Sequence, residues 1–192
     1  MEMVTLKGKV TSSFSDEEFF WFCHENKDLR IERNSNLEIY IMSPVTTLSG
    51  FWNMEIARQL ANWAAEEKNG FAFDSSTGFT LPDRSVLSPD ASWVTREKWV
   101  SLSEADKDRF ASICPEFVIE VKSKSDAIED LKNKMKTWIT NGVELGWLID
   151  IKENRSYIYK PGREEKILID ENKIIGEGPV QGFILDLSIL KI

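Results

Sequence analysis

The stretch Pro115-Glu-Phe-Val-Ile-Glu-Val-Lys122 is the strongest predicted strand of this chain of 192 residues. Successive side chains of a strand point to opposite faces of a sheet, so residues two apart share a face. The apolar residues of the stretch should therefore pack into one layer of the core, while Glu120 and Lys122 project together from the other face. The sequence thus predicts an acid and a lysine side by side on a buried strand.

The segments that follow this strand predict a second strand beside it. Ser123 to Asp126 reads as the start of a helix over 127 to 141, with apolar residues along one face and Gly142 at its end. A further buried strand is expected over 145 to 151. A strand, a crossover helix and a second strand generally form a parallel pair.

The N-terminal third predicts two helices and a hairpin. A capping box at Ser15 to Glu18 opens a helix through about Asn26, and two alternating runs, 29 to 33 and 37 to 42, predict a β-hairpin. After Pro44, apolar residues at helical spacing predict a long helix that Gly70 ends. Those core residues are Trp52, Ile56, Leu60 and Trp63.

The remaining segments predict short strands around a surface excursion. The excursion covers 96 to 113, which is charged and prone to form helices without a strong apolar stripe. The predicted strands or edges are 70 to 73, 77 to 81, 91 to 95, 157 to 159, 166 to 169, 173 to 175 and 182 to 187. With this length and no linker or repeat, we expect one domain over residues 1 to 192.

Composition limits the chemistry that the chain can perform. His24 is the only histidine, and Cys23 and Cys114 are not spaced as a zinc or disulfide motif, so zinc sites with several histidines are excluded. The remaining chemical groups are carboxylates and lysines, and carboxylates suit Mg²⁺ or Mn²⁺. No apolar run is long enough to cross a membrane, so we expect a soluble, cytoplasmic protein.

The charge balance does not favour a protein that coats nucleic acid. The chain has 24 Lys and Arg against 32 Asp and Glu, a net charge of −8, whereas such proteins are usually basic. One window is an exception, because 122 to 136 holds five lysines against three acids. That window is either a solvated helix face or a local basic surface.

Context selects one acid and lysine pair from several. The pattern acid-x-lysine occurs seven times, but most copies fall in predicted helices, turns or polar edges. The copy at Glu120 lies within an apolar strand, and Asp90, which leads into the predicted strand 91 to 95, is the best partner acid. Two carboxylates that hold a divalent ion, with a lysine beside them, can hydrolyse phosphodiesters.

The same residues carry a resemblance to a known family. Asp90, Glu120 and Lys122 match the PD-(D/E)xK nuclease pattern, and the wider sequence resembles the Uma2 family of restriction endonuclease-like proteins. The similar segments are 31 to 33, 41 to 44, 87 to 94, 115 to 126, 131 to 135, 142 to 150 and 157 to 162. The resemblance implies an α/β (α+β) fold with a mixed central sheet flanked by helices, plus an N-terminal helix and β-hairpin.

The resemblance also implies roles for individual residues. Asp90 and Glu120 would be metal ligands for Mg²⁺ or Mn²⁺, Lys122 the catalytic base and Glu32 a further acidic site residue. Lys134, on the helix after the motif, would lean over the same face. We take Lys134 and Lys124 as candidate substrate-binding residues.

The chain departs from the usual family pattern at two positions. Ser49 stands where many members have a histidine, and Leu37 replaces the glycine of the hairpin. The first change could remove a polar residue from the site. In contrast, Lys122 is retained although many relatives lack the motif lysine.

These observations predict a divalent-metal-dependent endonuclease that acts on nucleic acid, with DNA the expected substrate and a homodimer possible. The alternative is an inactive nuclease fold that binds nucleic acid or a protein.

Other interpretations of the site residues stay open at this point. Glu120 and Lys122 could form a structural ion pair, Asp90 could cap a turn and Glu32 could lie on the surface. Glu55 on the long helix could also reach the metal.

Overall fold

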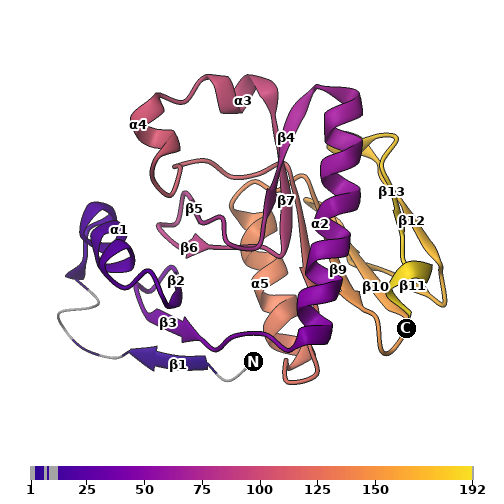
Figure 1. Cartoon of the computed structure of the whole chain (residues 1–192), viewed down its shortest axis with the longest axis horizontal. Coiled ribbons are helices and arrows are strands. Elements are labelled where there is room, and N and C mark those ends of the chain that lie inside the picture. The colour runs from indigo at the N-terminus through magenta and orange to yellow at the C-terminus, as the bar shows by residue number, and fades with distance from the viewer. Residues whose placement is uncertain (1–2, 7, 9–12, 192) are drawn as a thin grey trace.

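The computed structural model describes residues 3–6, 8 and 13–191. Figure 1 shows an N-terminal lobe beside a larger layered body. The elements in chain order are β1 (Met3–Leu6), α1 (Asp16–Glu25), β2 (Arg30–Arg33), β3 (Ile39–Met42), α2 (Thr47–Glu67), β4 (Gly70–Asp74), β5 (Phe79–Thr80), β6 (Val86–Leu87), β7 (Ala91–Thr95), α3 (Arg96–Val100), α4 (Glu104–Lys107), β8 (Phe117–Val121), α5 (Ile128–Thr140), β9 (Leu145–Asp150), β10 (Arg155–Tyr159), β11 (Lys166–Ile169), β12 (Lys173–Ile175), η2 (Gly178–Val180), β13 (Ile184–Asp186) and η3 (Ser188–Leu190).

A mixed sheet of six strands, in the order β11-β10-β9-β8-β7-β4, forms the larger body. Strands β8 and β9 are parallel, with Glu120 opposite Leu148, and the other neighbours are antiparallel. The predicted strand, helix and strand unit is therefore confirmed as β8, α5 and β9. Helices α2 and α5 lie on opposite sides of this sheet (Figure 1).

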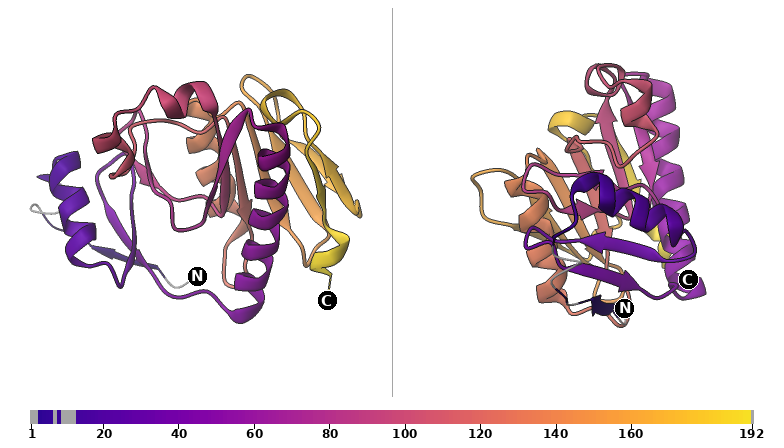
Figure 2. Two further views of the ribbon diagram at one scale, coloured as in Figure 1. Left: turned by 45° about the horizontal axis from the view of Figure 1, so that its top comes forward. Right: turned by 90° about the vertical axis from the view of Figure 1, so that its left-hand side faces the viewer.

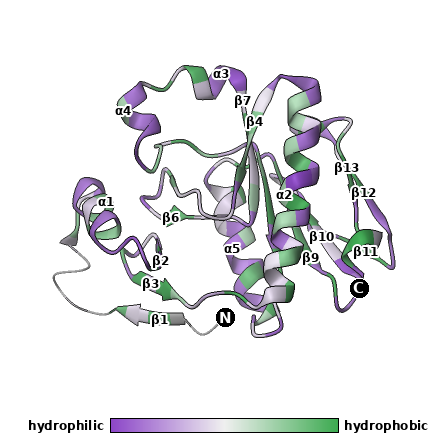
Figure 3. Ribbon diagram, in the orientation of Figure 1, coloured by the Kyte–Doolittle hydropathy of each residue, from purple (hydrophilic) through white to green (hydrophobic). Residues whose placement is uncertain are grey.

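The alternation of β8 divides its side chains between two apolar cores. Phe117, Ile119 and Val121 pack in the core that contains the buried residues of α2. Val118 packs in the second core, with Trp138 of α5. Hydrophobic residues concentrate on the central strands in Figure 3, whereas α2 and α5 carry both hydrophobic and hydrophilic residues. Glu120, two residues after Val118, therefore points toward α5.

The N-terminal lobe is a five-stranded sheet, β1-β3-β2-β6-β5, covered by α1 (Figure 2). The capping box is confirmed, because the Glu18 amide donates to the Ser15 side chain and the Ser15 amide donates to Glu18. The hairpin of β2 and β3 is also confirmed. Leu37 in its turn has a φ of 63°, a left-handed conformation that suits glycine.

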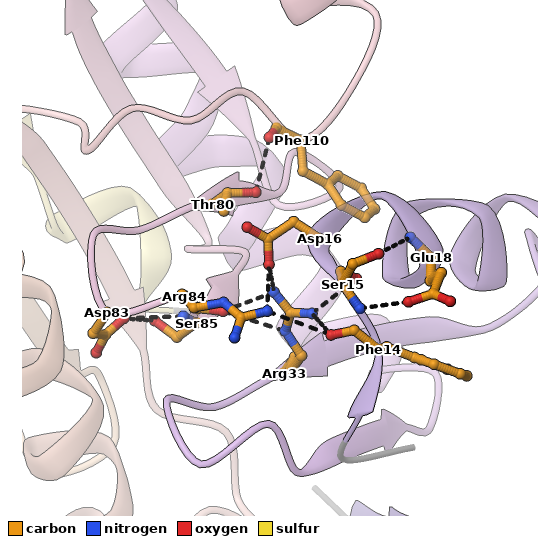
Figure 4. Close-up of polar contacts among 10 residues, drawn as sticks. All are labelled: Phe14, Ser15, Asp16, Glu18, Arg33, Thr80, Asp83, Arg84, Ser85 and Phe110. Atoms are coloured by element: carbon orange, nitrogen blue, oxygen red, sulfur yellow. Dashed lines mark hydrogen bonds and ion pairs between the residues drawn. The ribbon is translucent and has the colours of Figure 1, made fainter. Parts of the chain in front are cut away.

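Arg33 of β2 ties α1 to the sheet, as Figure 4 shows. Its guanidinium is fully buried and donates to the Arg84 carbonyl, with Nη2 to oxygen at 2.9 Å. It also pairs with Asp16 at 2.5 Å, and it lies 4.6 Å from the centre of the Phe19 ring. This network fixes β2, and with it Glu32, against α1.

The predicted end of the long helix is wrong, whereas the helix expected over 127 to 141 is confirmed within one residue at each end. Helix α2 ends at Lys68, which adopts a left-handed φ of 58°, and Gly70 instead begins β4. A Cβ on Gly70 would lie 2.3 Å from the Trp93 ring, so close packing explains that glycine. Helix α5 begins at Ile128 without a side-chain cap, while Asp126 accepts from the Ser123 amide at 2.8 Å.

Strands β1 and β6 were not expected from the sequence. Both are short, and they enter the N-terminal sheet by pairing with β3 and β2 respectively.

No helix within the described residues is both long and apolar enough to cross a membrane.

Candidate active site

Acidic residues from two sheets converge on one ammonium group. Lys134 Nζ lies 3.0 Å from Glu120 Oε1 and 3.1 Å from Glu32 Oε1. Glu120 comes from β8, Glu32 from β2 and Lys134 from α5. Glu120 is 3% exposed and Glu32 is 7% exposed. The expectation that Glu32 could lie on the surface is therefore wrong.

Further hydrogen bonds hold these groups in place. Trp138 Nε1 donates to Glu120 Oε1 at 2.9 Å, and the Ser88 amide donates to Glu32 Oε1 at 3.0 Å. Lys134 Nζ also donates to the Ser88 carbonyl at 3.1 Å. Each carboxylate thus receives two donors on one oxygen, and their second oxygens have no hydrogen-bond partner in the described structure.

Asp90 links helix α2 to the end of β8. Its Oδ1 accepts from Asn53 Nδ2 at 2.9 Å, and its Oδ2 accepts from the Val121 amide at 2.8 Å. Asn53 lies on α2 and Val121 closes β8. Because these partners are far away in the sequence, the interpretation of Asp90 as a local turn cap is wrong.

Burial and neighbouring charges shift the pKa values of the carboxyl groups in this cluster. Burial raises the pKa of Glu120 to about 7, and the negative charges of Asp90 and Glu32 add to this rise, while Lys134 and Trp138 oppose it. Burial also raises the pKa of Asp90, against the lowering effects of Lys134, the Val121 amide and Arg30. Like charges held together in a buried site disfavour ionisation.

Lys134 shows the opposite balance. Burial alone would lower the pKa of this ammonium, but Glu120, Glu32 and Asp90 together raise it above its ordinary value. The group is therefore protonated at neutral pH. It supplies a fixed positive charge among three carboxyl groups.

The structure does not contain the structural ion pair that was considered for Lys122 and Glu120. Lys122 Nζ lies 3.6 Å from Asp150 Oδ2 of β9 and donates to the Ser123 carbonyl at 3.5 Å. Among the described residues it forms no ion pair with Glu120. Lys122 is one residue beyond the end of β8, so its long side chain reaches the neighbouring strand, while α5 supplies the ammonium beside Glu120.

Two other candidates lie apart from the cluster of Glu32, Asp90, Glu120 and Lys134. Lys124 is exposed and lines a cavity of about 450 Å³ near the start of α2. Ser49, the residue that replaces the family histidine, lines the same cavity and bonds to Thr46. Glu55 forms an ion pair with Arg58 on its own helix.

Sequence reasoning missed Asn53, Ser88 and Trp138 as site residues. Trp138 was assigned only to the apolar face of its helix, although its indole N–H must find a partner when buried. Lys134 lies four residues before Trp138 on the same helix face, and this spacing is the signal that could have ranked it above Lys122.

The donor set is compatible with a hard divalent cation. In the part of the chain that the structure describes, no group of three or more His, Cys, Asp or Glu side chains is arranged to hold a metal. Mg²⁺, however, is commonly held by one or two carboxylates, with waters and substrate phosphate completing its shell. Asp90 and Glu120 are two carboxylates in this region, and the charge of Asp90 raises the pKa of Glu120.

The mixed sheet flanked by α2 and α5 defines a restriction endonuclease-like fold. A similar crystal structure is described as a "putative nuclease belonging to DUF820" from Anabaena variabilis, with a TM-score of 0.72 and 18% identity. The similarity covers 93% of this chain and 97% of that one.

The family model of Uma2, described as "Putative restriction endonuclease", matches residues 16–188. The chain belongs to the Uma2 family. No curated protein matches it.

Proposed function

We propose that this protein is a divalent-metal-dependent nuclease that hydrolyses phosphodiester bonds in nucleic acid, with DNA as its substrate. The observation that carries the proposal is the contact of Lys134 with both Glu32 and Glu120, near enough to Asp90 for its charge to act on them, within a nuclease family fold. Mg²⁺ or Mn²⁺ is the cofactor that this set of oxygen ligands suits.

Asp90 and Glu120 would hold the ion, and the chain fixes both beforehand. Asn53 and the Val121 amide orient Asp90, while Trp138 and Lys134 orient Glu120. A bound divalent ion supplies Lewis-acid polarisation of the phosphate and lowers the pKa of water. The surrounding hydrogen bonds reduce the rearrangement needed to form the site.

Lys134, rather than Lys122, would act on the reacting phosphate. Because it stays protonated, it cannot serve as a base in this state, but its charge can stabilise the negative charge that develops on the phosphate oxygens. Glu32 Oε2, which has no hydrogen-bond partner in the described structure, would accept a proton from the attacking water. Lys122 would support the strand ends through Asp150.

Lys124 would contact the substrate backbone at a position separate from this cluster. It lines the cavity near the start of α2 with a set of hydroxyl groups, and hydroxyls and lysines are common phosphate donors. The serines and threonine of this lining are Ser43, Thr46, Ser49, Ser123 and Ser125.

The second candidate function is a nuclease fold that binds nucleic acid or a protein without cleaving it. The observation in its favour is that Lys134 already occupies the space between Glu120 and Glu32, so no acidic trio is arranged for a metal in the described residues. The net charge of −8 agrees with weak binding of nucleic acid.

A panel of variants tests the proposal. Cleavage of plasmid and labelled oligonucleotides would be measured with Mg²⁺ and Mn²⁺ for wild type and for Asp90→Asn, Glu120→Gln and Lys134→Met. We expect each variant to lose activity by about 100-fold or more, because each removes charge stabilisation or an ion ligand. The melting temperature of wild type should rise when Mn²⁺ is added, and Asp90→Asn should abolish this rise.

Lysine variants identify which ammonium acts. Lys132→Met is the matched control, since Lys132 lies on the same helix as Lys134 and pairs with Glu165 at 2.7 Å; it should keep activity within about twofold. If Lys122→Met abolished cleavage while Lys134→Met did not, the assignment to Lys134 would be wrong. If wild type neither cleaved nucleic acid nor gained stability with Mn²⁺, the non-catalytic function would replace the proposal.

A homodimer would present two such sites to the two strands of a duplex. We keep this assembly as a prediction, which sedimentation of the full chain would test.

A further inference from the structure

A second cavity, also of about 450 Å³, opens between α1 and the start of β2. Its walls come from α1, the turn that follows it, Arg30 and Ile31 of β2, the turn after β4, Ser88 and Phe110. This volume falls in the range of pockets that hold a small ligand such as a nucleotide. The lobe that carries α1 lies beside the larger body, as Figure 1 shows.

This cavity shares Ser88 with the carboxylate cluster. The Ser88 carbonyl accepts from Arg30 Nη2 at 3.4 Å and from Lys134 Nζ at 3.1 Å, while its amide donates to Glu32. A ligand in the cavity would therefore lie beside Ser88, which is bonded to Glu32 and Lys134, the groups proposed to act on phosphate and water. Arg30 and Glu32 also project from the same face of β2, because they are two residues apart.

Arg30 has unused capacity to bind an anion. Its Nε is buried and has no hydrogen-bond partner, and its one described hydrogen bond, to Ser88, is long at 3.4 Å. A guanidinium carries five donors in a fork that matches phosphate oxygens. Lys27 at the cavity edge is exposed and forms no ion pair among the described residues, so it could bind the same anion.

The charge of this cavity differs from that of the whole chain. Its lining has two cations, Lys27 and Arg30, against one carboxylate, Asp28, in a protein of net charge −8, and Arg30 also acts on Asp90 of the neighbouring cluster. An anionic ligand is therefore drawn here rather than to the acidic surface elsewhere.

Three aromatic side chains line the same cavity as the cationic groups, and Arg109 lies 5.4 Å from the centre of the Phe20 ring. The rings of Phe20 and Phe110 have centroids 5.5 Å apart, and His24 stacks on Phe20 at 6.1 Å. All three line the cavity. Aromatic side chains of this kind bind nucleobases by stacking, with little preference for sequence.

We propose that this cavity binds one nucleotide of a single-stranded nucleic acid, with phosphate on Arg30 and Lys27 and the base against Phe20 and Phe110. The neighbouring phosphodiester then lies over the carboxylate cluster. The proposal rests on the proposed nuclease function and specifies its substrate. A base that stacks on Phe20 and Phe110 cannot remain paired in a duplex, so strands that are already unpaired avoid the penalty of opening one.

Binding of the full chain to a fluorescent eight-residue oligothymidylate, and to the matching duplex, tests this proposal. Fluorescence anisotropy in EDTA measures binding without cleavage. We expect the single strand to bind about tenfold more tightly than the duplex. Arg30→Gln should weaken that binding by about tenfold and Lys27→Gln by about threefold, because each loses a phosphate contact.

Two controls keep the result interpretable. Arg58→Gln removes an exposed arginine of α2 that does not line the cavity, and it should change the affinity less than twofold. Lys27→Gln changes only an exposed side chain, so it tests the site even if Arg30→Gln fails to fold, which thermal melting would reveal.

The outcomes separate this proposal from the nuclease function. Cleavage by wild type combined with unchanged affinity of Lys27→Gln and Arg30→Gln would overturn the nucleotide site alone. Tighter binding of duplex than of single strand, or no binding of the single strand at 100-fold excess of protein over probe, would overturn it as well. Binding that depends on Arg30 and Lys27 without any cleavage would support the site and overturn the nuclease.

Discussion

Two cations of this protein, the fully buried Arg33 and the partly buried Lys134, have opposite surroundings. Arg33 is bonded mainly to backbone carbonyls, those of Arg84, Phe14 and Ser15, and to one carboxylate that is about half exposed, Asp16.

Lys134 of α5, by contrast, has two carboxylates in direct contact, and the charge of a third, Asp90, helps to raise its pKa. Arg33 completes the packing of the N-terminal lobe, whereas Lys134 only partly neutralises an excess of negative charge. Burial of a charge therefore does not mark a functional site here; the excess of like charges around it does.

The largest effect that would test this contrast is loss of the structural cation. Arg33→Met should lower the free energy of unfolding by about 3–5 kcal/mol, because it leaves several carbonyls and Asp16 without their buried donor. Urea denaturation measures this. Arg84→Met is the control, since Arg84 is half exposed and pairs with the same Asp16 at 3.4 Å; it should cost less than about 1 kcal/mol. Equal losses in the two variants would contradict the distinction.

The next effect concerns pH and the excess of carboxylates. In the folded protein the pKa of Glu120 is about 7, against an ordinary value of 4.5. Between these two pH values the folded state holds a proton that the unfolded state has released. The contribution of this proton to the stability of the fold is fully present below pH 4.5 and is lost as pH rises through 7. As the pH rises from 4.5 to 8 in EDTA, the free energy of unfolding of Glu120→Gln should increase relative to that of wild type by up to about 3 kcal/mol.

Glu165 provides the control of opposite sign. Although burial acts to raise its pKa, hydrogen bonds from Lys132 and Tyr159 hold it below its ordinary value. The contribution of Glu165 to the stability of the fold is therefore present at neutral pH and is lost as the solution is acidified through the lowered pKa. If unfolding of Glu120→Gln and Glu165→Gln showed the same dependence on pH, the description of the cluster would be wrong.

A smaller effect is expected at the single carboxylate of the Arg33 network. Asp16→Asn should cost about 1 kcal/mol or less, because Asp16 is half exposed and the carbonyls still satisfy the guanidinium. Chemical denaturation at neutral pH measures this difference. A loss as large as that of Arg33→Met would mean that the ion pair, rather than the carbonyls, holds the lobe together.

The smallest change should stabilise the strand that carries both Glu32 and Arg33. Leu37→Gly should raise the free energy of unfolding by about 1 kcal/mol, since Leu37 has a φ of 63° that only glycine adopts without strain. Thermal and urea unfolding would measure it. Ser35→Gly in the same turn, whose φ is not positive, should bring no gain.

Sequence patterns predicted the parts of the fold that depend on local periodicity. The alternation of β8, the apolar face of α5 and the capping box at Ser15 each arise from neighbouring residues, and the structure confirms all three. The end of α2 was misplaced, because Lys68 takes the left-handed conformation expected of Gly70. Packing against Trp93 explains that glycine, and such a contact leaves no local signal.

The same limit applies to the candidate site. Strand alternation placed Glu120 on the correct face, and its expected partner acid Asp90 does come near it. Which lysine reaches Glu120 depends on how closely α5 packs on β8, and this distance is a property of the tertiary structure. A long side chain at a strand end, such as Lys122, can turn to a neighbouring strand, so its sequence spacing did not determine its contact.

The groups that hold Glu120 have a mechanical consequence. Its indole donor, Trp138, and its ammonium partner, Lys134, are four residues apart on one helix and contact the same carboxylate oxygen. Inserting one residue between them would rotate one contact away from β8 by about 100° while leaving the other in place. The spacing from Lys134 to Trp138 is therefore fixed by the carboxylate beneath it, and an insertion between them would separate the two contacts.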